Sequence, residues 1–378
     1  MKINFTGGPL LTGDSRRVKK YTFGAYKTFV MSPIKTGICS FGMSGKLFHG
    51  PFIDNHPGFE LAGIVERHRD ESREKYPHAK IYRSFEALIA DPSMELIVVN
   101  TPVQTHFDYV KAALLAGKKV IAEKPFTVNA AEAEELDRLA KETNGFLSVY
   151  QNRRYDGDFG ALKNIVQQGV LGELVEVQIR YDRYRVDPSG KEHKEGSLPG
   201  AGNLHDLGSH LIDQALQLFG WPKALFADIC IMREGVLAND YFELILMYGK
   251  MRVRLKASLV ARAQYPGYIL NGMLGSFMQE RSDLQEQQLL ANVKPTLENW
   301  CPALTQPDGF LHATVNGQEV KQATTSTSGN YMNYYNDVYK AITGQAPNPV
   351  PASDAVKTMR IIDAAFKSAA EKRVIDLV

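Results

Sequence analysis

The sequence predicts an α/β protein with two domains: an N-terminal, doubly wound parallel sheet and a C-terminal α+β domain with a large, mostly antiparallel sheet. Three observations predict this. From Ile34 onward, strand and helix patterns alternate, which builds a parallel sheet with helices on both faces. After about Tyr150, long alternating segments follow one another without helices between them, as in antiparallel sheets. The 378 residues, 44% of them hydrophobic, suffice for a large core and fit two domains better than one.

The expected divisions are a basic N-terminal tail over residues 1–33, a first domain over 34–150 and a second over 151–378. Residues 1–35 carry seven Lys or Arg and one Asp, so the remainder of the chain has a formal charge of −4. The longest apolar run in the first thirty residues is Leu10-Leu11, which is too short for the hydrophobic region of a secretion signal. We therefore expect an untethered tail ahead of a mildly acidic body.

In the first domain, short apolar runs predict strands and longer amphipathic segments predict helices. The expected strands are 35–40, 59–66, 81–82, 96–100, 119–122 and 146–150. The expected helices are 46–55, 70–76, 84–91, 104–116 and 130–144. Gly117 follows an apolar helical run, where a helix C-terminus favours a left-handed residue.

In the second domain, one helix over 159–168 precedes the strand-rich region. The expected strand segments are 174–185, 225–232, 241–259 broken at 248–250, 268–279, and 312–324 folding at Asn316-Gly317. Helices over 204–219 and 352–371 would cover one sheet face, and residues 281–310 look like an excursion that could lid a cleft. The other sheet face would meet a second copy of the chain, which predicts a homo-oligomer, a dimer or a tetramer.

Composition excludes several functional classes. No run approaches the roughly 18 apolar residues of a membrane helix, and the mildly acidic body argues against a nucleic-acid surface. Three cysteines lie far apart with no C-x-x-C pair, which supports neither a metal site nor a disulfide framework. A reducing, cytoplasmic location and a small-molecule partner fit best.

A glycine-bearing turn follows the first expected strand. Its residues are Ser40, Phe41, Gly42, Met43 and Ser44, and Gly45 closes the turn. Glycines there let the backbone approach a pyrophosphate, which the following helix N-terminus attracts. The usual G-x-G-x-x-G pattern has its first glycine where this chain has Ser40.

The second strand ends in Glu66, at the spacing where an acidic side chain would bind the adenosine ribose hydroxyls of NAD. Arg67 follows directly, and basic groups at this point would instead suit the 2′-phosphate of NADP. The sequence leaves NAD and NADP open.

Polar residues also follow the fourth and fifth strands. Thr101, Pro102 and His106 follow one, and Glu123 and Lys124 the other. In a parallel sheet both strand ends face the crevice where ligands bind. Pro125 restrains the backbone of Lys124, which would hold its ammonium group in place.

In the second domain, Asp206, His210 and Asp213 fall at i, i+4 and i+7 of an expected helix and would share one face. A carboxylate one turn from an imidazole can fix its tautomer and raise its basicity, as a general base for an alcohol requires. A buried histidine beside a capping aspartate would give the same pattern.

These motifs resemble the glucose-fructose oxidoreductase and inositol dehydrogenase (Gfo/Idh/MocA) family of nicotinamide-dependent enzymes, over nearly the whole chain from Ile34. The resemblance lies in the glycine turn followed by His49, the 101–106 stretch, Glu123-Lys124-Pro125, and residues 202–213. Residues 42–51, 148–156 and 181–185 look most like its NADP-dependent scyllo-inositol dehydrogenase branch, although Ser40 and Glu66 depart from that branch.

The resemblance implies a Rossmann domain over 34–150 and a substrate-binding domain over 151–378. It implies that Lys124 bonds the reacting oxygen, that His210, oriented by Asp206, exchanges its proton, and that Glu123, Thr101 and His106 line the nicotinamide side. Residues suited to reading several hydroxyls of a polyol or sugar are Arg153, Tyr155, Tyr184 and Arg185.

The expected activity is oxidation of a secondary alcohol of a cyclic polyol or sugar to its ketone, with NAD or NADP. The alternatives are an NAD-dependent glycoside hydrolase, which retains the cofactor through each cycle, and a catalytically silent nucleotide or sugar sensor on the same fold.

Overall fold

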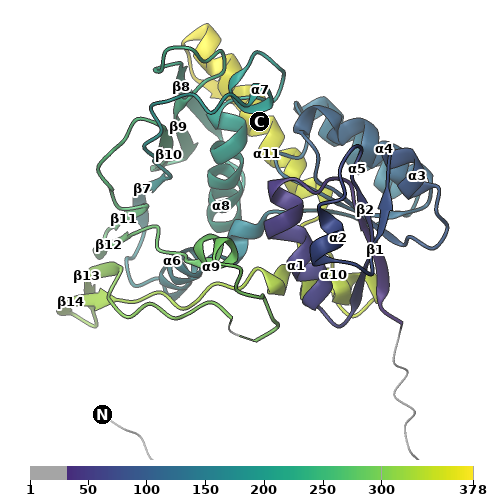
Figure 1. The fold of residues 1–378 in the computed structure, drawn as a ribbon. Helices are drawn as coiled ribbons and strands as arrows, with labels where there is room; N and C mark the ends of the chain where they lie inside the picture. The colour runs from purple at the N-terminus through teal and green to yellow at the C-terminus, as the bar shows by residue number, and fades with distance from the viewer. Residues whose placement is uncertain (1–31, 299, 378) are drawn as a thin grey trace, which may run out of the picture. The chain divides into compact units, whose positions relative to one another are not determined.

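The computed structural model describes residues 32–298 and 300–377. The expected N-terminal tail lies outside these residues, apart from its last two positions. Pro33–Val378 forms one compact unit, in which two sheets and their helices share a continuous hydrophobic core (Figure 1).

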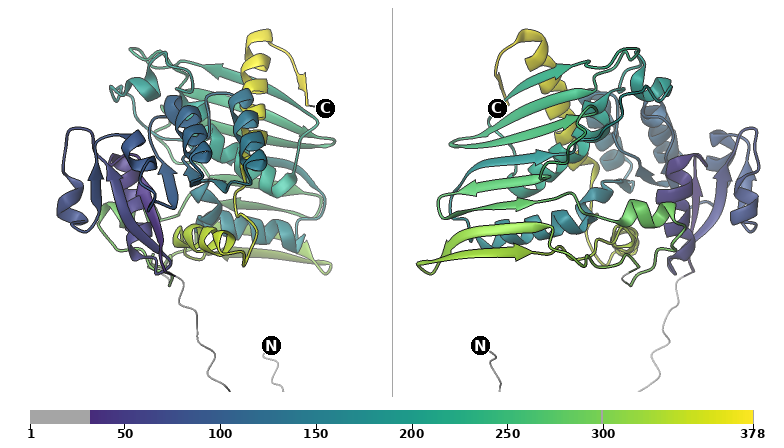
Figure 2. Two further views of the ribbon diagram at one scale, coloured as in Figure 1. Left: turned by 90° about the vertical axis from the view of Figure 1, so that its right-hand side faces the viewer. Right: turned by 60° about the vertical axis from the view of Figure 1, so that its left-hand side comes forward.

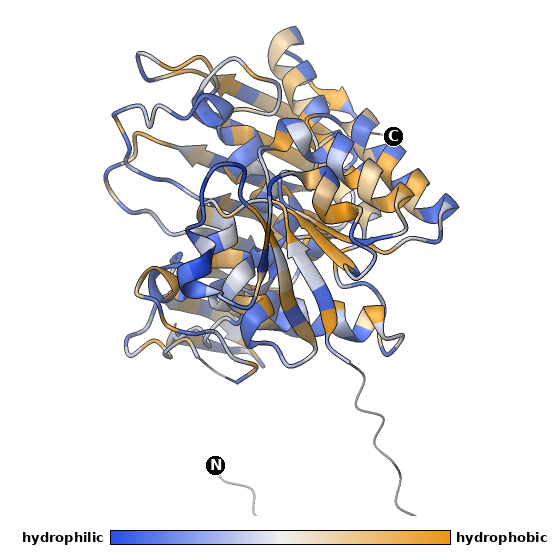
Figure 3. Cartoon of the chain, turned by 45° about the vertical axis from the view of Figure 1, so that its right-hand side comes forward, coloured by the Kyte–Doolittle hydropathy of each residue, from blue (hydrophilic) through white to orange (hydrophobic). Residues whose placement is uncertain are grey.

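The first sheet is parallel throughout, with strand order β3-β2-β1-β4-β5-β6. Its strands are β1 (Ile34–Ile38), β2 (Phe59–Val65), β3 (Lys80–Tyr82), β4 (Leu96–Val99), β5 (Lys119–Ala122) and β6 (Leu147–Val149). The central strand β4 is Leu-Ile-Val-Val and all four residues are buried, because helices cover both faces of the sheet. Figure 3 shows these strands as the hydrophobic centre of the domain.

The helices of this domain lie at the expected places. They are η1 (a π-helical turn, Gly45–His49), α1 (Gly50–Asn55), α2 (Ser72–Lys75), α3 (Phe85–Ile89), η2 (Val103–Thr105), α4 (His106–Leu115) and α5 (Ala130–Glu142). Side-chain caps begin two of them: Ser84 accepts from Ala87 N, and Asn129 accepts from Glu132 N. Gly117 ends α4 with φ +72°, as its position predicted.

The second sheet has nine strands in the order β14-β13-β12-β11-β7-β10-β9-β8-β15. Only β7 and β10 pair in parallel. Its strands are β7 (Leu174–Arg180), β8 (Ala224–Cys230), β9 (Tyr241–Tyr248), β10 (Met251–Ser258), β11 (Tyr268–Gly272), β12 (Gly275–Gln279), β13 (Gly309–Val315), β14 (Gln318–Thr324) and β15 (Ile375–Asp376). The segment 268–279, expected as one run, is two strands joined by a turn at Met273-Leu274.

Helices cover one face of this sheet, and no helix of the described residues covers the other (Figure 2). The remaining helices are η3 (Asn152–Tyr155), α6 (Gly157–Gln168), α7 (Glu192–Glu195), η4 (a π-helical turn, Leu204–Gly208), α8 (Ser209–Phe219), α9 (Gln285–Leu290), α10 (Met332–Ile342) and α11 (Ala352–Glu371). The described residues contain no helix long and apolar enough to cross a membrane.

The C-terminal region joins the two sheets. Tyr335 of α10 stacks on Phe52 of α1 with ring centroids 5.6 Å apart, and Val149 N, at the end of β6, donates to Val350 O. These contacts hold the second sheet's helices against the edge of the first sheet, so side chains from both halves can meet in one cavity.

Candidate active site

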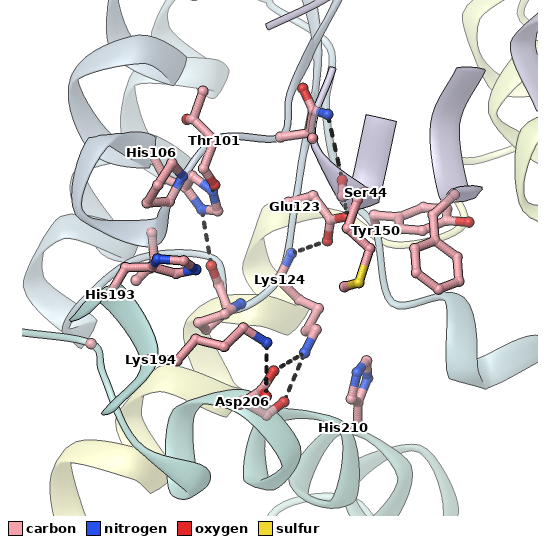
Figure 4. Close-up of a pocket in the computed structure, with 18 of the residues that line it drawn as sticks. Ser44, Thr101, His106, Glu123, Lys124, Tyr150, His193, Lys194, Asp206 and His210 are labelled. Atoms are coloured by element: carbon pink, nitrogen blue, oxygen red, sulfur yellow. Dashed lines mark hydrogen bonds and ion pairs between the residues drawn. The ribbon is translucent and has the colours of Figure 1, made fainter. Parts of the chain in front are cut away.

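A cavity of about 470 Å³ lies at the carboxyl ends of β1, β4 and β5 and is closed by residues of the second half. From β1 the strand order runs outward to β2 and β3 on one side and to β4, β5 and β6 on the other. The crevice at this switch point, between β1 and β4, is where open α/β sheets bind ligands. Figure 4 shows side chains from both halves pointing toward one another here.

The glycine turn forms one wall. Ser40, Gly42, Met43 and Ser44 line the cavity. A Cβ on Gly45 would lie 2.2 Å from the backbone oxygen of Ser40, so only glycine allows this close approach. Phe41 points elsewhere: it is buried and packs edge-on against Tyr76.

The Ser40 hydroxyl accepts a hydrogen bond from Gly42 N at 3.2 Å, so the residue that replaces the usual glycine stabilises the turn. Asn100, at the end of β4, donates to Ser40 O at 2.8 Å and also lines the cavity. Its buried Oδ1 has no hydrogen-bond partner within the described residues. The Asn100 side-chain oxygen is therefore free to accept a hydrogen bond next to the turn residues that line the cavity.

Glu66 differs from its expected role. Both carboxylate oxygens face the N-terminus of α2, where they accept from Glu71 N and Ser72 N at 3.0 Å each and from the Ser72 hydroxyl. The side chain is buried. This carboxylate is occupied by the protein's own amides, so it is not free to bind ribose hydroxyls. Arg67 remains exposed and, among residues 32–298 and 300–377, its side chain donates only to Tyr109 Oη, at 3.4 Å.

His106 joins the ends of β4 and β5. Its Nε2 lies 2.8 Å from Thr101 O and its Nδ1 lies 3.0 Å from Pro125 O. Burial lowers the pKa of His106, although its backbone contacts and Glu123 oppose the shift. Thr101, Pro102 and His106 all line the cavity.

Glu123 is held by a buried chain of hydrogen bonds. His49 Nε2 lies 2.9 Å from Glu123 Oε1, His49 Nδ1 lies 2.6 Å from Tyr335 Oη, and Ser44 Oγ donates to Glu123 at 2.9 Å. Burial alone would raise the pKa of Glu123, but the hydrogen bond and charge of His49, with Lys124, outweigh it and lower the pKa to about 2. Glu123 is thus ionised and rigidly placed. The sequence pointed to His49 only as part of the family resemblance and predicted no role for it.

Lys124 and Lys194 share the carboxylate of Asp206 (Figure 4). Lys124 Nζ donates to Asp206 Oδ1 and to its backbone oxygen at 2.8 Å each, and Lys194 Nζ donates to Oδ2 at 3.1 Å. Burial lowers the pKa of Lys124, although Asp206 opposes this shift. Burial would raise the pKa of Asp206, but the two lysines hold it well below its usual value.

His210 lines the same cavity, and its side chain makes no hydrogen bond with the described residues. Burial, followed by the charges of Lys124 and Arg153, holds its pKa well below the usual value, while Asp206 opposes this shift. The imidazole is therefore neutral and able to accept a proton.

The expected orientation of His210 by Asp206 is not seen, because the two lysines occupy the carboxylate. The local backbone contributes to this arrangement. Residues 204–208 form a π-helical turn rather than an α-helix, so the simple i, i+4 spacing does not hold. Asp213 faces away and pairs with Arg154 through both carboxylate oxygens, at 2.6 and 2.8 Å.

Of the four residues expected to read substrate hydroxyls, only Arg153 lines the cavity. Tyr155 donates to Asp337 at 3.2 Å because the 3₁₀ turn η3 rotates it away. Tyr184 and Arg185 are exposed beyond the end of β7. The polar cavity residues that sequence reasoning missed include Tyr150, Asn152, Arg183, Lys191, His193, Lys194 and Glu286.

Two family models match the chain. One, described as an oxidoreductase family NAD-binding Rossmann fold, matches residues 34–151. The other, described as the C-terminal alpha/beta domain of the same oxidoreductase family, matches residues 163–377. The chain belongs to the Gfo/Idh/MocA oxidoreductase family.

Individual relatives are similar to this chain over about nine tenths of its length. The scyllo-inositol 2-dehydrogenase (NADP(+)) IolW of Bacillus subtilis is 38% identical over 91% of this chain and 96% of its own length. A solved structure of a Bacteroides fragilis oxidoreductase is 42% identical, with a TM-score of 0.83 over 92% of this chain and all of its own. That of the oxidoreductase yvaA from Bacillus subtilis is 36% identical, with a TM-score of 0.87 over 92% of this chain and 99% of its own.

The residues present fit a nicotinamide dinucleotide. The close approach at Gly45 and the change in the direction of strand connections between β1 and β4 place the glycine turn and the N-terminus of η1 at the crevice, where they form a cradle. The protein is thus an oxidoreductase with NAD or NADP as its cofactor.

Proposed function

We propose that the protein oxidises a secondary alcohol of a cyclic polyol or sugar to its ketone, and catalyses the reverse reduction. The observation that carries this proposal is the meeting of Lys124, Asp206 and His210 in one cavity next to the dinucleotide cradle. The name of the relative IolW supports an inositol-like substrate.

A nicotinamide cofactor, when bound, would supply the hydride acceptor for the carbon that bears the hydroxyl group. Ser40, Gly42, Met43 and Ser44 would hold its phosphates, and Thr101, Pro102, His106 and Glu123 would lie along its nicotinamide side. These residues line a single cavity. The hydroxyl group would lie between Lys124 and His210, from the two halves of the chain.

Lys124 stabilises the oxygen as it gains negative charge, since a cation in a site of low dielectric constant is most effective there. His210 accepts the hydroxyl proton, which its low pKa and unbonded side chain allow. Asp206 keeps Lys124 charged and in place through two hydrogen bonds, one from its carboxylate and one from its backbone oxygen. It also lies near enough to favour the imidazolium ion.

NADP is the preferred cofactor in this proposal. Glu66 is turned into the N-terminus of α2, where two backbone amides partly offset its charge, so it opposes a 2′-phosphate less than a free carboxylate would. Arg67 and His68 are exposed and have no acidic partner among the described residues. The NADP(+) in the name of IolW agrees with this preference.

Two copies of the chain would meet through the open face of the nine-stranded sheet (Figure 2). An apolar row crosses four strands of this face: Ile269, Met278, Phe310 and Ala323 pair in register. Met278 and Phe310 are 42% and 38% exposed, and burial against a second copy would remove this surface from water. The three cysteines are unpaired, in keeping with a reducing, cytoplasmic location.

The test is a panel of inositols and aldoses, their carboxylate and phosphate derivatives, and the matching keto forms, each with NAD and with NADP, with the absorbance of the reduced cofactor as the readout. We expect one polyol to reduce NADP faster than NAD, and His210→Ala to slow the reaction strongly, but measurably, without loss of cofactor binding. Cofactor binding with no turnover across the panel would contradict the proposal and favour a sensor or a glycoside hydrolase.

A further inference from the structure

Three arginines surround the ring of Tyr181, and we call them the arginine cluster: Arg153, Arg183 and Arg281. Their guanidinium carbons lie 4.8, 5.0 and 4.9 Å from the ring centroid. They come from η3, from the segment after β7 and from the segment after β12. Like charges this close repel one another unless acidic groups or a ligand compensate them.

The protein's own carboxylates compensate only one member of the arginine cluster. Arg153 pairs with Asp156 at 3.4 Å and Glu286 at 3.3 Å. Within the described residues, Arg183 and Arg281 have no carboxylate within 4.0 Å, and Arg281 donates instead to Arg180 O and to Gln214.

Two buried nitrogens of the cluster, Arg153 Nε and Arg281 Nη1, have no hydrogen-bond partner among the described residues. Unmade hydrogen bonds of buried charged groups are costly. Both nitrogens are buried and Arg281 does not line the cavity, so they add to the uncompensated charge of the cluster, while Arg153 and Arg183 are the members that can face a ligand.

The whole cavity has the same imbalance. Its basic lining residues are Lys124, Arg153, Arg183, Lys191 and Lys194, and its acidic ones are Glu123, Asp206 and Glu286. Two lysines share the single carboxylate of Asp206. After burial, Lys124 and Arg153 are the groups that most lower the pKa of His210, and Arg281 lowers it further.

The cofactor's phosphates do not account for the arginine cluster. They are expected at the glycine turn and the N-terminus of η1, which belong to the first half of the chain. All three arginines follow residue 150, and Arg153 and Arg183 reach the cavity from the side of the second sheet.

We propose that the substrate carries an acidic group, a carboxylate or a phosphate, which Arg183 and Arg153 bind while its secondary alcohol lies between Lys124 and His210. The inference rests on the proposed function and narrows its substrate class to acidic polyols and sugars. Guanidinium groups suit this task because they form paired hydrogen bonds to carboxylate and phosphate oxygens.

Titration calorimetry on the NADP-loaded protein tests the inference, with turnover measured in parallel. The ligands are glucose against glucuronate, gluconate and glucose 6-phosphate, and myo-inositol against its monophosphate. We expect at least one acid to bind about 10- to 100-fold more tightly than its neutral counterpart, the gain of charge-assisted hydrogen bonds. The carboxylate and phosphate series show which group is recognised.

Arg183→Gln should remove most of this preference, and Arg183→Lys should keep part of it. Arg262→Gln is the matched control: Arg262 is also stacked on a tyrosine, Tyr184, but it is exposed and does not line the cavity. If Arg183→Gln does not fold, the salt dependence of binding to the unaltered protein decides, since only an anionic ligand should bind less tightly at high salt.

Neutral polyols that bind and react as well as the acids would overturn the inference and leave the proposed function standing. Acids that bind through Arg183 without turnover would support the anion site and contradict the proposed function. Failure of every acid to bind more tightly than its neutral counterpart would overturn the anion site.

Discussion

Replacing Lys124 with methionine removes the cation from the proposed reaction centre and keeps most of the side-chain volume. Lys124 Nζ lies 2.8 Å from two oxygens of Asp206, with its side chain 16% exposed. Loss of a donor that stabilises transition-state charge costs about 100- to 1000-fold in kcat, or roughly 2.7–4 kcal/mol. We expect this loss in kcat, with little change in cofactor affinity.

The fold should survive this substitution because Lys194 still pairs with Asp206, at 3.1 Å. Lys111→Met is the control: it removes an ion pair of similar length, 2.7 Å to Glu135, outside the cavity. Steady-state kinetics with the best polyol, cofactor fluorescence and thermal melts separate the effects. Turnover of Lys124→Met within a few-fold of the unaltered protein would refute the reasoning.

Three further predictions follow from the site. The rate of oxidation should fall as pH drops through the pKa of His210, which is lowered below its usual 6.5, and as pH rises through the pKa of Lys124, which is lowered below its usual 10.5. His210→Ala should flatten the acidic limb of the pH-rate profile. An unchanged limb would mean that another group is the base. Glu66→Ala should lower the free energy of unfolding by about 1–3 kcal/mol, because it uncaps α2, and should leave the NADP-to-NAD preference intact; a switch in preference would restore the ribose role. Gly45→Ala should lower both the melting temperature and the affinity for the cofactor, because its Cβ would meet Ser40 O at 2.2 Å and displace the turn; unaltered affinity would contradict the cradle.

The sheets were predictable where pattern and turn chemistry agreed. Asn316-Gly317 marked the hairpin between β13 and β14, and both residues have positive φ, 52° and 77°. The turn at Met273-Leu274 was missed because two apolar residues occupy it. Helix α10 was also missed, although its buried Met332, Tyr335 and Val338 recur at helical spacing.

The candidate site was predictable where regular elements end. Lys124 follows strand β5 and His210 lies in the first turn of α8, so the sequence predicted both as site residues. The structure brings them together in one cavity. Arg183 lies in an irregular segment after β7, and Lys194 lies in the four-residue helix α7, which is too short to give a periodic signal. Glu66 is an acidic residue at the predicted position. Its side chain nevertheless turns toward the free amides at the start of α2, and sequence spacing does not predict the direction of a side chain.

The ratio of ketone formed to cofactor reduced tests the central claim most directly. With the most reactive polyol and an excess of NADP, we expect one molecule of ketone for each molecule of NADPH, and Lys124→Met should reduce the formation of both together. A product released by cleavage of a glycosidic bond, with no net reduction of the cofactor, would contradict the account.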